Sequence, residues 1–482
     1  MIQGTSSYSG KSFLVMSLCR IFRDKGVKVA PFKSQNTSLN SFVTIDGKEI
    51  SRAQALQAFS AGIEPSVEMN PILIKPSGES KSQIVAFGKP YMDIDAGDYY
   101  KDFALNKGLK IVKKAYRALE RKYELIIIEG AGSPAEINLY SQDIANMRIA
   151  DLADAPVILV ADIERGGVFA SIFGTLALLK KEHKRRVKGV VINKFRGDIK
   201  ILEPGIEEIE KLTKRTVLGV IPYIEGLRLP EEDSVSLQDS QKNQGIKKIA
   251  VIRLPRISNF SDFDPLLNDG IDVRYISEPE ELKFADAIII PGTKNTIEDL
   301  KWLRDRGFEK NIRSLYGTVP IIGICGGYQM LGNGITDESG DIRGMGLLDV
   351  ETKFEGYHKT TRQVRGKVTA VSGMFEGMRG CKVRGYEIHM GKTELGRRAT
   401  PVFELENVKE GAIDDKGLVF GTYLHGIFDS RSFREGFLRF LGVNANATSK
   451  LQKEIWDESI DRAAGVVSTS IDISRLEEGL DV

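Results

Sequence analysis

Short apolar runs alternate with longer amphipathic segments along most of the chain, and this alternation constrains the fold more than any other feature of the sequence. Strands that are separated by helices form parallel sheets whose two faces the helices cover, so the pattern predicts an α/β fold. In the first 230 residues the candidate strands are 27–30, 125–128, 156–161, 189–193 and 217–221, and the candidate helices are 11–22, 51–61, 100–122 and 168–179.

One interruption of this pattern divides the chain into two α/β domains. Residues 231–247 are polar and lack periodicity, as expected of an interdomain linker. Alternation then resumes, with candidate strands at 249–254, 273–276, 287–290, 319–324 and 419–424. We therefore predict an N-terminal domain at 1–230, a C-terminal domain at 248–435 and a helical tail at 436–482.

Charge and cysteine usage narrow the class of protein. The 68 basic and 66 acidic residues nearly cancel, so no global field favours nucleic acid. The three cysteines lack paired metal-ligand spacing and are too few for a disulfide framework. No apolar stretch approaches the roughly 20 residues that span a bilayer, and the N-terminus does not resemble a signal peptide. We expect a cytoplasmic protein with no membrane or nucleic-acid partner, and its oligomeric state stays open.

A glycine-rich loop, Gly-Thr-Ser-Ser-Tyr-Ser-Gly-Lys-Ser at 4–12, follows a minimal strand and leads into a helix. Gly4 and Gly10 allow the backbone to curl so that successive N–H groups point at phosphate oxygens. Lys11 adds a positive charge for the outer phosphates, and Ser12 offers a hydroxyl to Mg²⁺. The loop has one more residue between its glycines than the standard phosphate loop. The loop, with Lys11 and Ser12 at the start of the helix, predicts a nucleotide-binding site.

Polar side chains at the ends of the neighbouring strands could complete this site, because parallel sheets place ligand groups there. Glu129 follows the strand 125–128, and with Ser12 it is the predicted Mg²⁺ ligand. Asp162 ends the next apolar run and could also bind metal. Either carboxylate could instead cap the helix that follows it. Lys33 lies just past the strand 27–30 and could reach the nucleotide or remain a solvated loop lysine.

A cysteine at 325 lies on a sharp glycine-flanked turn between an apolar strand and a helix. This arrangement is typical of a nucleophile elbow, in which the N–H of the next residue, Gly326, faces the developing oxyanion. Gly292 follows the strand 287–290 and could supply a second N–H. A lone cysteine is more often a core residue, but glycines on both sides of Cys325 argue against simple packing.

A thiol nucleophile needs a base, and the chain has four histidines: His183, His358, His389 and His425. His425 follows the strand 419–424, so it can lie at the same sheet edge as Cys325. It is the predicted base, although loops after strands also hold structural histidines. No third residue that would orient the imidazole is evident.

Eight ordered motifs resemble the cobyric acid synthase family, and the resemblance extends from the N-terminus to about residue 435. These motifs are PFKSQN at 31–36, EISRAQ at 49–54, MNPILIKPS at 69–77, EGAGSPAEIN at 129–138, RGGVF at 165–169, NKFRGD at 193–198, PGTKNT at 291–296 and GYEIH at 385–389. Together they are far more specific than either site motif alone.

The resemblance implies a dethiobiotin-synthetase-like phosphate-loop domain followed by a class I glutamine amidotransferase-like domain of the cobalamin type. Such domains use a Cys–His pair and lack the usual acid two residues after the histidine, which would account for Ile427. Tyr8 departs from the family, in which Asp is usual, and this puts one acidic contribution to the Mg–ATP site in doubt. The resemblance also suggests that 33–40 and 133–138 contact the corrinoid or phosphate, and that 385–389 bind glutamine or join the domains.

The reaction that the resemblance implies amidates the b, d, e and g carboxylates of adenosylcobyrinic acid a,c-diamide. It would use ATP with Mg²⁺, take ammonia from glutamine and bind the corrinoid as substrate. Cobyrinic acid a,c-diamide synthase has the same two-domain organisation, but the SPAEINL segment at 133–139 favours the cobyric acid synthase family. A partitioning-type ATPase would carry a further lysine where this chain has Thr5 or Ser6. A stand-alone cysteine hydrolase would leave the first 230 residues unexplained.

Overall fold

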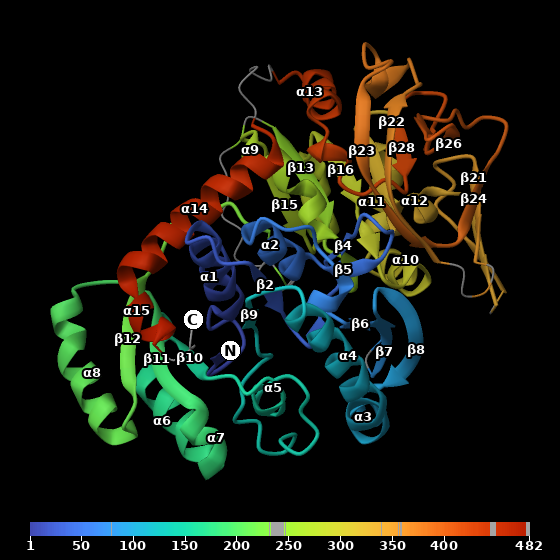
Figure 1. The fold of residues 1–482 in the computed structure, drawn as a ribbon. Helices are drawn as coiled ribbons and strands as arrows, with labels where there is room; N and C mark the ends of the chain where they lie inside the picture. The colour runs from blue at the N-terminus through green and yellow to red at the C-terminus, as the bar shows by residue number, and fades with distance from the viewer. Residues whose placement is uncertain are drawn as a thin grey trace.

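The protein is described by a computed structural model that covers residues 1–478 except 79, 231, 233–244, 246, 339, 355, 357–358 and 444–449. It contains two α/β domains, as the alternation predicts (Figure 1). The predicted linker, 231–247, falls outside the described residues except for Glu232, Gly245 and Lys247. In the described part of the chain, no helix combines the length and the apolar character that crossing a bilayer requires.

A parallel sheet forms the centre of the N-terminal domain. Its order is β2 (Val29–Phe32), β9 (Leu125–Ile128), β1 (Ile2–Gly4), β10 (Val157–Asp162), β11 (Val187–Phe195) and β12 (Thr216–Pro222), with a single bridge joining β9 to β1. Alternate strand residues enter two separate cores, so helices cover both faces. The helices are α1 (Lys11–Asp24), α2 (Arg52–Ser60), α4 (Leu109–Glu120), α5 (Met147–Leu152), α6 (Val168–Leu178), α7 (Lys181–Arg186) and α8 (Ile199–Thr213).

The segment between β2 and β9 holds short strands that the apolar pattern did not indicate. One small sheet contains β3 (Gln35–Thr37), β6 (Ile72–Pro76), β7 (Lys81–Ala86) and β8 (Lys89–Asp95), and a hairpin contains β4 (Ser41–Val43) and β5 (Glu49–Ser51). The helix predicted at 100–122 is divided, because α3 (Ala96–Asp98) and the π-helix η2 (Tyr99–Gly108) precede α4. These strands carry polar residues and prolines, so hydrophobic periodicity does not mark them.

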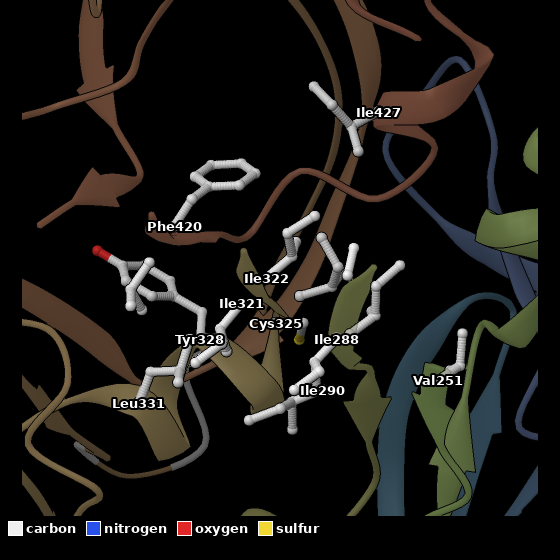
Figure 2. Close-up of a cluster of buried hydrophobic side chains, with 14 of the residues drawn as sticks. Val251, Ile288, Ile290, Ile321, Ile322, Cys325, Tyr328, Leu331, Phe420 and Ile427 are labelled. Carbon is white, nitrogen blue, oxygen red and sulfur yellow. The ribbon is translucent and has the colours of Figure 1, made fainter. Parts of the chain in front are cut away.

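The C-terminal domain is built on a second, largely parallel sheet. Its order is β15 (Asp272–Ile276), β13 (Lys248–Ile252), β16 (Ala287–Ile290), β18 (Ile321–Ile324), β28 (Val419–Thr422) and β27 (Ala412–Ile413), of which β27 is antiparallel. Isoleucines of the central strands pack with aromatic side chains such as Phe420 and Tyr328, and Cys325 is a member of the same buried cluster (Figure 2). The helices are α9 (Asp264–Asn268), α10 (Thr296–Asp305), α11 (Phe308–Leu315), α12 (Gly326–Leu331) and α13 (Arg431–Phe440).

Antiparallel strands flank this sheet. The largest pair is β22 (Lys359–Val368) with β23 (Lys382–Met390), extended by β25 (Phe403–Leu405) and β26 (Val408–Glu410). A second group contains β19 (Gly334–Asp337), β20 (Gly340–Arg343), β21 (Val350–Lys353) and β24 (Lys392–Leu395), and β14 (Ile257–Ser258) pairs with β17 (Gly292–Thr293). β23 faces the N-terminal domain, because it lies against β4.

The C-terminal tail returns to the N-terminal domain. The predicted boundary at 435/436 falls inside α13, whose apolar face packs into the C-terminal core. The next helix, α14 (Gln452–Ser470), lies along α1 and is followed by α15 (Ile473–Glu477) (Figure 1). Arg20 of α1 donates to Asp457 and Asp461 of α14 at 2.9 and 2.7 Å. The tail therefore helps to cover one face of the first sheet.

The two domains contact each other through polar side chains close to both candidate sites. The N–H of Ser41 donates to Oδ1 of Asn259 at 2.9 Å, and Oγ of Ser261 donates to Oδ1 of Asn40 at the same distance. Lys294 donates to Oε1 of Gln83 at 2.8 Å. The segment that follows β3 is thus held against the loop that follows β14.

Candidate active sites

Cys325 lies on a strained turn between β18 and α12. Its φ of 52° and ψ of −106° are unusual for a residue with a side chain, a conformation that costs about 1–3 kcal/mol. A Cβ at position 327 would lie 1.9 Å from the carbonyl oxygen of Ile290, so only glycine fits there. The N–H of Cys325 donates to the carbonyl of Thr422 at 2.8 Å, which ties the turn to β28.

His425 reaches the same edge of the sheet as Cys325, because β18 and β28 are parallel neighbours. Gly292 lies close to the imidazole, because a Cβ added at this position would be 3.1 Å from Cε1 of His425. Gly326 lies close to the residue after Gly292, because a Cβ added at position 326 would be 3.2 Å from the backbone nitrogen of Thr293. The structure therefore brings Cys325, His425, Gly292 and Gly326 together. These are the four residues that the sequence predicts for the site of the thiol nucleophile.

A buried carboxylate, Asp262, completes this group, and sequence reasoning missed it. Oδ2 of Asp262 lies 2.6 Å from Nδ1 of His425, and its other oxygen accepts from the N–H of Gly426 at 3.2 Å. Asp262 belongs to the 3-10 turn η4 (Phe260–Phe263), while Ile427 packs into the hydrophobic cluster (Figure 2). The acid approaches from a different segment, and no local pattern marks it in the sequence.

The charge of His425 follows from its neighbours. Burial alone would lower the pKa of the imidazole, but the Asp262 carboxylate and the hydrogen bond with Cys325 outweigh it and raise the pKa to about 10. The amide of Asn259 lies 3.4 Å from both ring nitrogens. Because Nδ1 faces Asp262, Nε2 is the nitrogen available to the thiol. The group can hold an imidazolium beside a thiolate.

The other histidines have different surroundings. His389 stacks on the ring of Tyr423 with centroids 3.7 Å apart, and burial lowers its pKa to about 4. His183 lies in the N-terminal domain, where Nε2 is 2.8 Å from the carboxylate of Asp151. His358 lies outside the described residues. Within the described chain, His425 is the histidine that contacts Cys325.

The glycine-rich loop has the shape of a phosphate cradle. Gly10 has φ of 102°, and a Cβ there would lie 1.9 Å from the Asn193 amide, while a Cβ at Gly4 would lie 2.9 Å from Nζ of Lys11. Lys11 donates to the carbonyls of Ser6 and Gly132 at 2.9 and 3.0 Å. Burial lowers the pKa of Lys11 to about 8. A phosphate group would place a negative charge directly beside this buried ammonium, whose present hydrogen bonds go to carbonyl oxygens.

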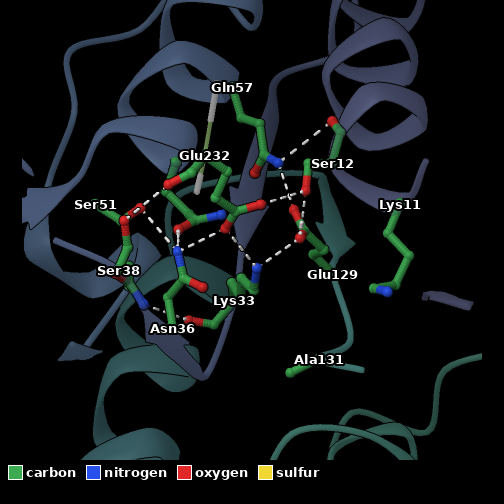
Figure 3. Close-up of polar contacts among 12 residues, drawn as sticks. Lys11, Ser12, Lys33, Asn36, Ser38, Ser51, Gln57, Glu129, Ala131 and Glu232 are labelled. Carbon is green, nitrogen blue, oxygen red and sulfur yellow. Dashed lines mark hydrogen bonds and ion pairs between the residues drawn. The ribbon is translucent and has the colours of Figure 1, made fainter. Parts of the chain in front are cut away.

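The predicted partners of the loop form one network (Figure 3). Oγ of Ser12 donates to Glu129 at 2.8 Å, and Nζ of Lys33 lies 2.7 Å from the same carboxylate. Glu232, which sequence reasoning placed in the linker, joins them: it lies 3.0 Å from both Ser12 and Lys33. Asn36 also donates to Glu232, at 2.8 Å. Lys33 is therefore part of the site and not a solvated lysine.

Two other predicted positions lie outside this network. Asp162 is 2.7 Å from Nζ of Lys194 and accepts from the N–H of Glu164, so it acts as an ion-pair partner and a turn cap. Tyr8 has φ of 60° and a half-exposed side chain. In the described residues no group of three His, Cys, Asp or Glu side chains forms a metal site. A metal ion at this site would therefore be coordinated by Ser12 and fewer than three such side chains.

Both halves of the chain match families of known proteins. Residues 1–237 match the CobQ/CobB/MinD/ParA nucleotide binding domain, and residues 248–433 match the CobB/CobQ-like glutamine amidotransferase domain. These matches agree with the phosphate cradle in the first domain and the thiol–imidazole group in the second.

Full-length relatives are similar over almost the whole chain. The probable cobyric acid synthase of Methanothermobacter thermautotrophicus is 50% identical, and the alignment covers 100% of this chain and 99% of the relative. That of Methanococcoides burtonii is 49% identical, covering 99% and 96%. The cobyric acid synthase of Pelotomaculum thermopropionicum is 47% identical, covering 99% and 95%. The chain therefore belongs to the cobyric acid synthase family of glutamine-dependent, amide-forming ligases in cobalamin biosynthesis.

Proposed function

We propose that this chain uses ATP and glutamine to convert the b, d, e and g carboxylates of adenosylcobyrinic acid a,c-diamide into amides. One observation carries the proposal: a thiol–imidazole–carboxylate group and a phosphate cradle occur in one chain and lie on either side of a polar domain contact. The proposal includes a cytoplasmic location, where ATP and glutamine are available.

The glutaminase half begins with attack of the Cys325 thiolate on the side-chain amide of glutamine. The N–H groups of Gly326 and Gly292 stabilise the oxyanion, and Nε2 of His425 donates its proton to the leaving ammonia. The resulting thioester is hydrolysed by water, which releases glutamate. Asp262 keeps Nδ1 of the imidazole protonated and oriented throughout.

The synthetase half activates a carboxylate that would otherwise be a poor acylating agent. The corrinoid carboxylate takes the γ-phosphoryl group of ATP, and ammonia then displaces phosphate from the acyl phosphate. Lys11 and Lys33 hold the phosphates, and the backbone at Gly4 and Gly10 leaves room for them.

The oxygen donors beside the loop fit a magnesium ion. Oγ of Ser12 and the carboxylate of Glu129 are 2.8 Å apart, and Glu129 is buried. Hydroxyl and carboxylate oxygens are ligands that Mg²⁺ accepts, and it usually keeps several waters as well. When bound, the ion would neutralise charge on the phosphates. Lys33, which now pairs with Glu129, would then be free to contact the nucleotide.

Mass spectrometry of the corrinoid product tests this function. The purified chain, incubated with ATP, glutamine and adenosylcobyrinic acid a,c-diamide, should convert four carboxyl groups to amides. A parallel incubation with cobyrinic acid distinguishes the a,c-diamide synthase reaction. Amidation of cobyrinic acid alone would reject the proposed substrate, and absence of any amidated product would reject the ligase activity.

A further inference from the structure

Arg52 links the two domains beside the glutaminase site. It is the first residue of α2 in the N-terminal domain, yet its Nη2 donates to Oη of Tyr386 on β23 at 2.8 Å. Its guanidinium also lies over the rings of Phe42 and Tyr386, at 5.7 and 5.5 Å from their centroids. Arg52 is buried, so this contact is made in the interior of the domain interface.

Tyr386 contacts His425 as well as Arg52. The two rings are stacked with centroids 5.2 Å apart and an interplanar angle of 13°. Their backbones exchange two hydrogen bonds, of 2.9 and 3.1 Å. Oη of Tyr386 also lies 3.4 Å from Oδ1 of Asp262, whose other oxygen holds Nδ1 of His425. Arg52 therefore restrains both the ring that stacks on the imidazole and the carboxylate that orients it.

The same helix contacts the phosphate site. Nε2 of Gln57 donates to the carboxylate of Glu129, and Oε1 of Gln54 accepts from Asn36 at 3.0 Å. Asn36 in turn donates to Glu232. Gln54 and Gln57 lie on α2, as Arg52 does, and this nine-residue helix is one continuous element. A ligand that rearranges Glu129 or Asn36 would act on the helix that presents Arg52.

We propose that Arg52 is a positioning residue for His425, and that α2 transmits occupancy of the phosphate site to glutamine hydrolysis. Two sites are coupled when a shared element makes different contacts in their two states. Here the shared element is α2, with the Glu129 network at one end and Tyr386 at the other. Glutamine would then be hydrolysed fastest when an acceptor is being activated. This role rests on the proposed ligase reaction.

The test compares glutamine hydrolysis by the full chain with and without ATP and adenosylcobyrinic acid a,c-diamide. In Arg52→Met, which keeps a long apolar stem, we expect the ligand-stimulated kcat to fall roughly tenfold, as is typical of such coupling. KM for glutamine should change little, because Arg52 acts through His425. Arg52→Lys retains a donor for Tyr386 and should recover part of the loss.

Two further variants separate coupling from simple stabilisation of the interface. Tyr386→Phe keeps the stacked ring but removes Oη, so its effect should be non-additive with that of Arg52→Met. Arg20→Met removes another buried arginine that bridges distant segments through Asp457 and Asp461, and it should leave the stimulation unchanged.

Ammonium-driven amidation provides the reference for a folded synthetase and should persist in Arg52→Met. The role assigned to Arg52 is overturned if Arg52→Met is stimulated like wild type, if only its KM changes, or if its effect adds fully to that of Tyr386→Phe. Failure of the wild-type chain to amidate the corrinoid with either glutamine or ammonium would instead reject the proposed function.

Discussion

Asp262 and His425 lie 163 residues apart in the chain, yet a carboxylate oxygen of Asp262 is 2.6 Å from Nδ1 of His425 in the protein interior. The position where class I glutaminases carry their acid is occupied here by Ile427, which is buried among apolar side chains. A thiol, an imidazole and a carboxylate thus form the geometry of a triad, with the acid contributed by a separate turn.

Asp262→Asn should lower glutamine-dependent activity by about 10²–10⁴-fold, because an amide neither fixes the tautomer nor stabilises the imidazolium. The measurement is the initial rate of glutamate release from glutamine. Amidation driven by ammonium does not use His425, so it should persist and provide the control. A variant with wild-type glutaminase activity would remove Asp262 from the mechanism.

The same pair predicts how stability depends on pH. The pKa of His425 is raised to about 10 from its ordinary value of 6.5, so folding favours the imidazolium. The contribution of this imidazolium to the free energy of unfolding is complete below about pH 6.5, and it is lost as pH rises through about 10. The difference in Tm between wild type and Asp262→Asn should therefore be largest near pH 6 and narrow towards pH 10. A difference that widens with pH would contradict the assigned charge state.

Nucleotide binding should be accompanied by proton uptake at Lys11. Burial lowers the pKa of this lysine to about 8, and a bound phosphate would raise it again. Calorimetric titration with a non-hydrolysable ATP analogue near pH 8.5 should give heats that depend on the ionisation enthalpy of the buffer. Lys11→Arg, whose guanidinium stays charged, should reduce that dependence. Binding heats of the wild-type protein that do not depend on the buffer would argue against a lowered pKa of Lys11.

Cys325→Ser should abolish glutamine-dependent amidation while ammonium still supports turnover. A serine hydroxyl on the same turn is a much weaker nucleophile, so glutamate release should fall by about 10³-fold or more. The measurement compares product formation with glutamine and with concentrated ammonium. Cys381→Ser, at a partly buried cysteine away from the site, is the matched control. A folded Cys325→Ser protein that is inactive with both nitrogen donors would contradict the two-site mechanism.

Glu49→Gln should destabilise the domain interface by about 3–5 kcal/mol, the usual cost of removing one partner from a buried ionic group. Glu49 is buried and pairs with Lys75 and with Lys359 of the other domain. These lysines hold the pKa of Glu49 well below its usual range, so its stabilisation is present above about pH 4.5 and lost on acidification. Chemical denaturation measures the change.

Glu404→Gln is the control for that measurement, because Glu404 forms an exposed ion pair with Lys367. Such pairs contribute about 0–1 kcal/mol, so this variant should unfold almost like wild type. Equal losses in the two variants would show that burial of Glu49 does not determine its contribution.

Several features of the fold and the sites could be predicted because they depend on residues close together in the chain. The phosphate cradle needs Gly4, Gly10 and Lys11 within one loop, and the elbow needs glycines beside Cys325. Glu129 and His425 follow apolar strands directly. Since parallel strands end at the same edge of a sheet, local patterns were sufficient to predict that such groups meet there.

The sequence by itself determined the two α/β domains and the residues presented at the carboxyl ends of their strands, because backbone periodicity and glycine requirements are local properties. Only the tertiary structure decided that Asp262 orients His425, that Glu232 enters the phosphate site, that α14 packs on α1 and that Arg52 reaches Tyr386. These partners come from distant segments, and their distances depend on how complete domains pack. No local pattern encodes that packing.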